Sequence, residues 1–232
     1  YNYAPTMLAI KRASRWEKEM KQILRKEGVP EDFFYLMVAE SHAENATSWA
    51  GAKGYWQFMK ETGREYGLRI DEEVDERLNP IKATHAACAY LKKAYRMFGN
   101  WSLVAASYNQ GMGATRYNLK KQKAQGYYDL YLNPETAQYL YRIVALKTIL
   151  QSPELYGFQV TAEDLYPEIP YKTVEADTAI DDLVQFAQEQ GTNYKLLRRQ
   201  NPWILDYSLE EPEEEEPYTF RISTPADFEQ RR

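Results

Sequence analysis

The sequence from Val38 to Met59 reads VAESHAENATSWAGAKGYWQFM, and the rest of the chain is best understood from this stretch. An acid ends a set of residues spaced i, i+3, i+4 and i+7, which share one face of an α-helix: Phe33, Leu36, Met37 and Glu40. Its neighbours on that face are large and apolar, so burial should disfavour the charged carboxylate and raise the pKa of Glu40. A carboxyl group still protonated near neutral pH can donate a proton to a leaving oxygen.

A loop rich in small residues follows, and then an aromatic and amide cluster. Gly51 and Gly54 let the backbone approach a ligand closely. Flat aromatic faces beside the Gln57 amide suit a sugar. The common alternative for a helical glutamate is a solvated position or an ion pair. The in-register position of Glu40 and this loop favour a site instead.

Composition limits the class of protein. The chain has 232 residues, enough for one large domain or two smaller ones. Its 20 tyrosines suit a carbohydrate groove, although many amphipathic tyrosines simply line the edge of a core. The net charge is −5 and there is no basic stripe, so we expect no nucleic-acid partner.

Cysteine, histidine and hydropathy exclude further classes. Cys88 is the single cysteine, so no intrachain disulfide can form, and we expect it to be a small buried apolar residue. His42 and His85 do not have the spacing of a ligand pair, so we predict neither a metal nor a cofactor. No apolar run approaches the roughly 20 residues that span a bilayer. Because the sequence begins at Tyr1, we expect any membrane tether to lie outside it.

Residues 1–152 predict an all-helical domain. An asparagine N-cap followed by proline at the first helical position occurs twice, at Asn79-Pro80 and at Asn133-Pro134. We expect a helix over Trp56–Tyr66. The helix over Pro134–Gln151 is apolar on more than one side, which predicts a central buried helix.

Residues 171–222 have a different pattern. A strand begins at Tyr171, and a helix is predicted from Asp177 to the stop at Gly191. A second short helix should end at Asn201-Pro202, and a last strand covers Tyr218–Ile222. The predicted order is therefore strand, helix, helix, strand.

The remaining segments read as connections. Residues 153–170 are punctuated by prolines and predict an irregular connector. Residues 209–217 contain a run of glutamates and predict a solvated acidic loop. Residues 223–232 are expected to form a frayed tail.

Several motifs, in order, resemble the soluble-lytic-transglycosylase domain of bacterial peptidoglycan lyases, in the branch of membrane-bound lytic murein transglycosylase D. They are Glu40-Ser41, Ser48, Gly51-Ala52-x-Gly54-x-Trp56-Gln57-Phe58-Met59, Thr62-Gly63-Arg64-x-Tyr66-Gly67-Leu68, Val74-Asp75-Glu76-Arg77-x-Asn79-Pro80, Ala105-Ala106-Ser107-Tyr108-Asn109-x-Gly111 and Glu135-Thr136-x-x-Tyr139. The resemblance covers residues 8–158. Residues 171–222 resemble, more loosely, a LysM glycan-binding module.

The resemblance implies an α+β chain: an all-α, lysozyme-like catalytic domain followed by a small βααβ LysM-like module. It implies a lyase that cleaves the β-1,4 bond between N-acetylmuramic acid and N-acetylglucosamine and leaves 1,6-anhydro ends. In this family a single glutamate, here Glu40, serves as acid and then as base. Ordinary glycoside hydrolysis needs two carboxylates. Of the other acids, Glu44 should be solvated or capping, and Asp75-Glu76-Arg77 reads mainly as local ion pairing.

The resemblance also implies substrate-binding residues. The groove near the cleaved bond is lined by Ser48, Gln57 and Met59. The acid or the acetamido group is positioned by Tyr108 and Asn109. The wall behind Glu40 is formed by Glu135 and Tyr139. Taken singly, each fits an ordinary structural role, such as a turn residue, core filler, helix cap or helix-dipole acid. Only the ordered set favours a site.

The expected partner is the peptidoglycan glycan strand, which places the protein in a bacterial cell envelope. The periplasm is the predicted compartment, with an outer-membrane lipoprotein as one option. Two alternatives stay open at this point. One is a goose-type-lysozyme-like hydrolase on the same helical scaffold, and the other is a non-catalytic peptidoglycan-binding protein. Endo- and exo-cleavage are equally compatible with the sequence.

Overall fold

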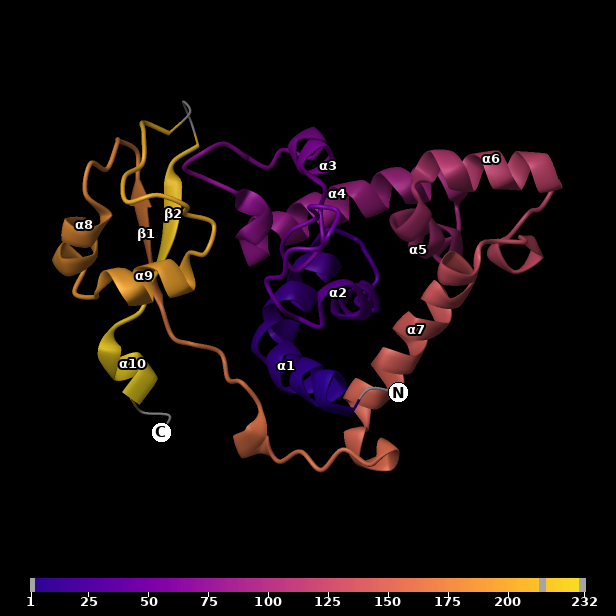
Figure 1. Cartoon of the computed structure of the whole chain (residues 1–232), viewed down its shortest axis with the longest axis horizontal. Coiled ribbons are helices and arrows are strands. Elements are labelled where there is room, and N and C mark those ends of the chain that lie inside the picture. The colour runs from indigo at the N-terminus through magenta and orange to yellow at the C-terminus, as the bar shows by residue number, and fades with distance from the viewer. Residues whose placement is uncertain (1–2, 213–215, 230–232) are drawn as a thin grey trace.

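The computed structural model describes residues 3–212 and 216–229, and most of its regular structure is helical (Figure 1). The first part holds α1 (Tyr3–Lys26), α2 (Phe33–Ser41), α3 (Lys60–Glu65), η1 (Glu76–Leu78), α4 (Pro80–Phe98), α5 (Trp101–Gln110), α6 (Met112–Gln122), η2 (Tyr127–Asp129) and α7 (Pro134–Gln151). The second part holds η3 (Pro153–Tyr156), η4 (Ala162–Asp164), β1 (Lys172–Ala176), α8 (Leu183–Glu189), α9 (Tyr194–Gln200), β2 (Tyr218–Ile222) and α10 (Pro225–Glu229). The predicted fold class, a helical domain followed by a small module with two strands, is confirmed.

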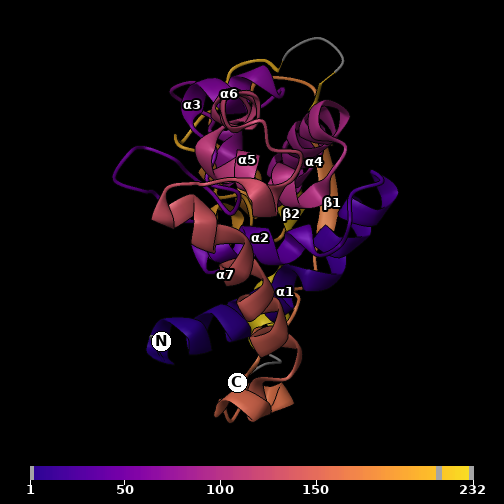
Figure 2. The ribbon, with the colours of Figure 1, turned by 90° about the vertical axis from the view of Figure 1, so that its right-hand side faces the viewer.

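Helix α2 lies at the centre of the first part, with α7 in front of it in the view of Figure 2. Every residue from Phe33 to Ala39 is buried, so the helix is enclosed on all sides and not only along the predicted stripe. Glu40 follows directly and is only partly buried. An enclosed apolar helix therefore ends by presenting one carboxylate at the edge of the core.

Both predicted asparagine caps are confirmed. The Asn79 side chain accepts hydrogen bonds from the backbone N–H groups of Ile81 and Lys82 at the start of α4. Asn133 does the same for Thr136 at the start of α7. These side chains replace hydrogen-bond partners that the first helical turn lacks.

The predicted helix over Trp56–Tyr66 is wrong in its first turn. Helix α3 begins only at Lys60, and the preceding residues form a tight turn. In that turn Lys53 and Phe58 exchange backbone hydrogen bonds of 3.0 and 3.1 Å, and Gln57 has a positive φ of 51°. A left-handed residue cannot continue a right-handed helix, so the turn delays the helix start.

Helix α7 is not the central buried helix that its apolar content predicted. Only Thr136, Tyr139 and Ile143 are buried, and Val144 keeps 52% of its surface exposed. The buried positions face α2 and α5, the helices that α7 contacts most. Tyr141 is exposed as well, whereas Leu140 and Leu146 are partly buried against the core. Burial depends on which elements pack against each side of the helix, and the pattern in the sequence could not reveal this.

The second part is built on β1 and β2, which pair antiparallel from Lys172 with Ile222 to Ala176 with Tyr218. Helix α8 begins at Leu183 and not at Asp177, because Asp182 caps it and Ile180 instead pairs with Leu209. The predicted tail is partly helical: α10 lies within it, and residues 230–232 lie outside the described residues.

The connector passes along α1 on its way to β1, as Figure 1 shows. The N–H of Tyr166 donates to the Lys11 carbonyl at 2.9 Å, and the Ser14 hydroxyl donates to the Tyr166 carbonyl at 2.8 Å. Within the predicted acidic loop, residues 213–215 lie outside the described residues. The division into 1–152, 153–170 and 171–222 stays a prediction. Across the described residues, no helix combines the length and apolar character needed to cross a bilayer.

Candidate active site

The Glu40 carboxylate meets a phenol from another helix. Its Oε1 accepts a hydrogen bond from the Tyr139 hydroxyl, and the Tyr139 side chain is only 1% exposed. Burial raises the pKa of Glu40, whereas the Tyr139 hydrogen bond and the charge of Arg142 act in the opposite direction. The negative charge of Glu135 raises the pKa of Glu40 further. The net pKa is above the ordinary value, so protonation persists toward neutral pH.

Asn109 links the ends of α5 and α7 beside this acid. Its Nδ2 donates to the Glu135 carboxylate at 3.3 Å, and its Oδ1 accepts from the Thr136 hydroxyl at 2.8 Å. The Glu135 side chain is exposed. Asn109 thus contacts Glu135 and its neighbour Thr136, one turn before the Tyr139 whose hydroxyl meets Glu40.

Tyr108 connects the acid to the loop before α3. Its hydroxyl donates to the Trp56 carbonyl at 2.7 Å, and its ring lies 6.4 Å, centroid to centroid, from the Phe58 ring. Burial raises the pKa of Tyr108 well above the usual range, and the charge of Glu40 adds to this effect. The Tyr108 phenol thus stays neutral and acts as a hydrogen-bond donor that fixes the loop.

The three loop residues have different roles. The Gln57 Nε2 donates to the carbonyls of Ala46 at 3.1 Å and Gly54 at 2.7 Å. The Ser48 hydroxyl accepts from the backbone N–H of Ala52 at 3.0 Å. These two side chains therefore shape the loop itself.

Met59 differs from the other two. Its side chain is 45% exposed, which does not fit core filler. It is available to a ligand on this surface. The loop therefore combines residues that hold its shape with one that offers apolar surface.

Backbone strain gathers in the same segment. His42, Ala43 and Gln57 have φ values of 51°, 53° and 51°, in the left-handed region that side chains with a Cβ disfavour. All three lie within seventeen residues after Glu40. Such residues cluster at functional sites because the surrounding structure must hold them in place.

The residues that support this loop were not predicted from the sequence. Arg77 was interpreted as part of a local ion pair, but its guanidinium also donates to the carbonyls of Gly51 at 3.1 Å and Phe58 at 3.3 Å. A Cβ at Gly54 would lie 1.8 Å from the Arg77 carbonyl oxygen, so only glycine fits there. The glycine at position 54 was the one signal in the sequence of this close backbone contact.

Other acids and the thiol lie apart from the site. Glu44 is exposed and pairs with Arg12 at 2.6 Å. Cys88 is fully buried, as predicted, and burial raises its pKa to about 12. Within residues 3–212 and 216–229, no three His, Cys, Asp or Glu side chains gather in a way that could hold a metal ion.

Both parts of the chain match families of known proteins. Residues 18–131 match the family model of the transglycosylase SLT domain. Residues 172–226 match that of the soluble lytic transglycosylase C-terminal LysM-like domain. The first part of the chain is thus similar to SLT domains and the last part to the LysM-like domain, and both predicted resemblances are confirmed.

A curated relative agrees with this assignment. Over 147 residues the chain is 35% identical to membrane-bound lytic murein transglycosylase D of Escherichia coli K12, and the same protein from a second E. coli strain gives the same values. The match covers 61% of this chain but 32% of the relative, so the chain spans about a third of the relatives' length. Among solved structures, an inactive mutant of the lytic transglycosylase Slt from Pseudomonas aeruginosa aligns with a TM-score of 0.47 at 24% identity, over 64% of this chain and 26% of that one.

Proposed function

We propose that this chain is a peptidoglycan lytic transglycosylase that cleaves the β-1,4 bond between N-acetylmuramic acid and N-acetylglucosamine. The observation that carries the proposal is the Glu40 carboxyl at the end of an enclosed helix, with a raised pKa and a neutral tyrosine as its hydrogen-bond partner. The SLT domain and the similarity to a lytic murein transglycosylase support the same reaction.

In the proposed mechanism Glu40 first donates its proton to the oxygen between the two sugars, and the bond from that oxygen to the anomeric carbon breaks. The carboxylate formed is stabilised by the Tyr139 hydroxyl, which already points at Oε1. Glu40 then takes the proton of the O6 hydroxyl as O6 bonds to the anomeric carbon. The 1,6-anhydro ring closes, Glu40 is protonated again and no water is consumed.

The arrangement of acids supports one carboxylate in place of two. Hydrolases of either stereochemical type pair a general acid with a second carboxylate across the sugar. Glu44 is exposed and held by Arg12. Glu135 is exposed and accepts from Asn109. Neither the goose-type hydrolase nor the non-catalytic binding protein is favoured by the comparisons.

The proposed substrate-binding residues are those that surround Glu40. Glu135 and Tyr139 form the wall behind the acid, Tyr108 and Asn109 position the acid or the acetamido group, and Ser48, Gln57 and Met59 line the groove near the cleaved bond. The contacts of Tyr139 with Glu40 and of Asn109 with Glu135 support this arrangement. We propose peptidoglycan glycan strands as the partner and the bacterial cell envelope as the location, with the periplasm as the compartment. The name of the membrane-bound relative supports the envelope.

Product analysis tests the reaction. Purified sacculi are digested with the protein, and the released fragments are identified by mass spectrometry. We expect 1,6-anhydro-muramoyl ends, which are lighter by one water than the reducing ends a hydrolase leaves. Glu40→Gln should release neither product while still binding sacculi. Reducing ends from the wild type would assign the chain to the hydrolases, and cleavage by Glu40→Gln would remove Glu40 from its role.

A further inference from the structure

A segment of the SLT domain is built into the core of the LysM-like domain. Val74 is 0% exposed and belongs to the apolar cluster formed by the strands and helices of that domain. Its backbone pairs with Ile204. On either side, the N–H of Asp75 donates to the Trp203 carbonyl at 2.8 Å, and the N–H of Leu205 donates to the Glu73 carbonyl at 2.7 Å.

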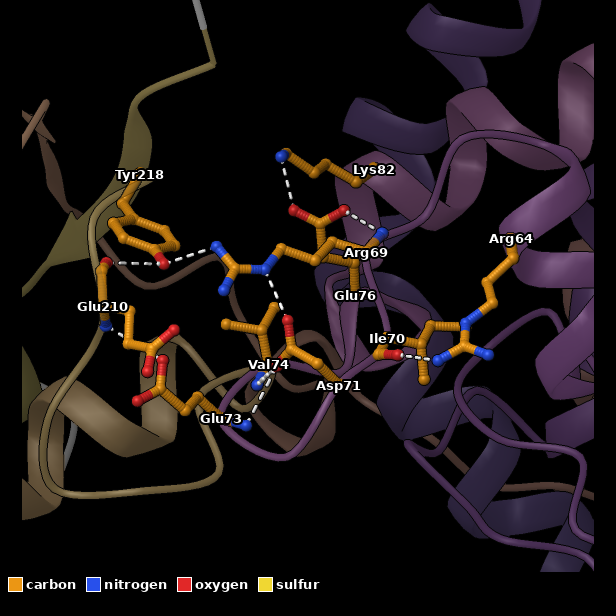
Figure 3. A network of polar contacts seen from close by, with 10 residues as sticks. All are labelled: Arg64, Arg69, Ile70, Asp71, Glu73, Val74, Glu76, Lys82, Glu210 and Tyr218. Atoms are coloured by element: carbon orange, nitrogen blue, oxygen red, sulfur yellow. Dashed lines mark hydrogen bonds and ion pairs between the residues drawn. The ribbon is translucent and has the colours of Figure 1, made fainter. Parts of the chain in front are cut away.

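Polar side chains hold the same segment from both directions, as Figure 3 shows. Arg69 donates to Asp71 and to the Tyr218 hydroxyl, both at 2.5 Å. The Glu73 carboxylate accepts from the backbone N–H of Glu210 at 2.9 Å. Tyr218 and Glu210 belong to the LysM-like domain, so the two domains share one network across residues 69–76.

The segment continues directly into the support of the active-site loop. The Asp75 carboxylate is 2% exposed and receives the Arg77 guanidinium at 2.8 and 2.7 Å. Lys53, which lies within the loop, is 3.2 Å from the same carboxylate. The Nη1 of the same guanidinium donates to the carbonyls of Gly51 and Phe58.

We infer that the LysM-like domain is a positioning element for the active-site loop of residues 47–59, acting through Val74, Asp75 and Arg77. Trp203 fixes the backbone of Asp75, Asp75 fixes Arg77, and Arg77 fixes the loop that holds Gln57 in its strained conformation. This role is additional to any glycan binding by that domain. Its consequence for catalysis rests on the proposed function.

The test compares two Val→Ala substitutions in the same apolar cluster, each made in the full chain. Val74→Ala removes side-chain volume from the segment that leads to Asp75. Val174→Ala removes the same volume from β1, where Val174 packs against the same cluster but does not lead to the loop. Both variants should lose some stability of the LysM-like domain.

Hydrogen exchange of peptides covering residues 47–59 reports on the loop without any substrate. The reporters are the N–H groups of Lys53, Gly54 and Phe58, which are hydrogen-bonded in the loop. Val74→Ala should speed their exchange about fivefold or more, because local opening becomes easier when its packing is weakened. Val174→Ala should leave them at the wild-type rate, while exchange in α8 and α9 rises in both variants.

Turnover on sacculi completes the experiment. Val74→Ala should lower kcat/KM several-fold, because the loop that it loosens carries Ser48, Gln57 and Met59 of the proposed substrate-binding surface, whereas Val174→Ala should leave kcat/KM near the wild-type value. Equal loop exchange in the two variants would overturn the positioning role, whatever their activity. A wild type that forms no anhydro ends would overturn the proposed function instead, and the exchange comparison would still decide whether the two domains are coupled.

Discussion

The two carboxyl groups that flank the active-site loop in the sequence, Glu40 and Asp75, have pKa values shifted in opposite directions. Burial opposes ionisation of both. Glu40 contacts a neutral phenol, and its pKa is raised. Asp75 is held by Arg77 and Lys53, and their hydrogen bonds and charges bring its pKa below the usual value. The charged partners of Asp75 outweigh the effect of its burial, whereas the hydrogen bond from Tyr139 does not outweigh the burial of Glu40.

This difference in pKa gives the two acids different roles, one in the reaction and one in holding the loop. A carboxyl that keeps its proton can give it away, so Glu40 suits general acid catalysis. A carboxylate that is always ionised cannot act as an acid near neutral pH, but it can hold a buried guanidinium in one geometry. Tyr108 holds the loop between them at Trp56, and Arg77 holds it at Gly51 and Phe58.

The largest expected effect is on turnover. Glu40→Gln should lower kcat by about 100- to 10,000-fold, the contribution typical of a general acid. The raised pKa means that Glu40 favours the folded state at low pH and that this contribution is lost as pH rises through the folded-state value. The variant should therefore be at least as stable as the wild type in alkaline buffer.

Denaturant titration at several pH values measures this change in stability. Glu44→Gln is the matched control, because Glu44 is an exposed glutamate that pairs with Arg12. It should keep near-wild-type turnover. A loss of activity in the control equal to that of Glu40→Gln would mean that the substitutions act through charge alone.

The next effect is on stability. Asp75→Asn leaves the Arg77 guanidinium buried without its counter-charge and should lower the free energy of unfolding by about 3–5 kcal/mol. Because the pKa of Asp75 is lowered, its contribution is present above the unfolded-state value and is lost as pH falls through the folded-state value. Urea unfolding from pH 7 downward should show that the variant lacks part of the wild-type acid dependence. Parallel pH curves for the two proteins would contradict the charge pairing.

Tyr139→Phe should act more mildly and mainly on the pH profile. The hydroxyl lowers the pKa of Glu40, so its removal should move the alkaline limb of kcat/KM to higher pH. We expect kcat at the optimum to fall about tenfold, which corresponds to about 1.4 kcal/mol. A limb that moves to lower pH would show that Tyr139 does not stabilise the carboxylate.

Lys53→Met should have the smallest effect. Lys53 is the second and more exposed partner of Asp75, at 3.2 Å, and Arg77 remains after the change. The unfolding free energy should fall by less than about 1 kcal/mol, as for other partly exposed ion pairs. Thermal unfolding measures it, and a loss as large as that of Asp75→Asn would make Lys53 the principal partner.

The sequence alone determined much of the fold and the identity of the candidate acid. Asn79-Pro80 and Asn133-Pro134 fix helix starts through local hydrogen bonds, which need no tertiary contact. The apolar neighbours of Glu40 indicated that a carboxyl would be kept from water. These features depend on residues close together in the chain, and this is why they could be predicted.

Only the tertiary structure decided what surrounds these local elements. The sequence could not tell that α7 would leave Val144 exposed, because burial depends on which other helices cover each side. The sequence also could not show that Val74 lies in the apolar core of the LysM-like domain. Nor could it show that Arg77, besides pairing with Asp75, donates a hydrogen bond to the loop at Phe58. Val74 and Ile204, which pair there, are 130 positions apart in the sequence (204 − 74), and no local pattern predicts a contact at that separation.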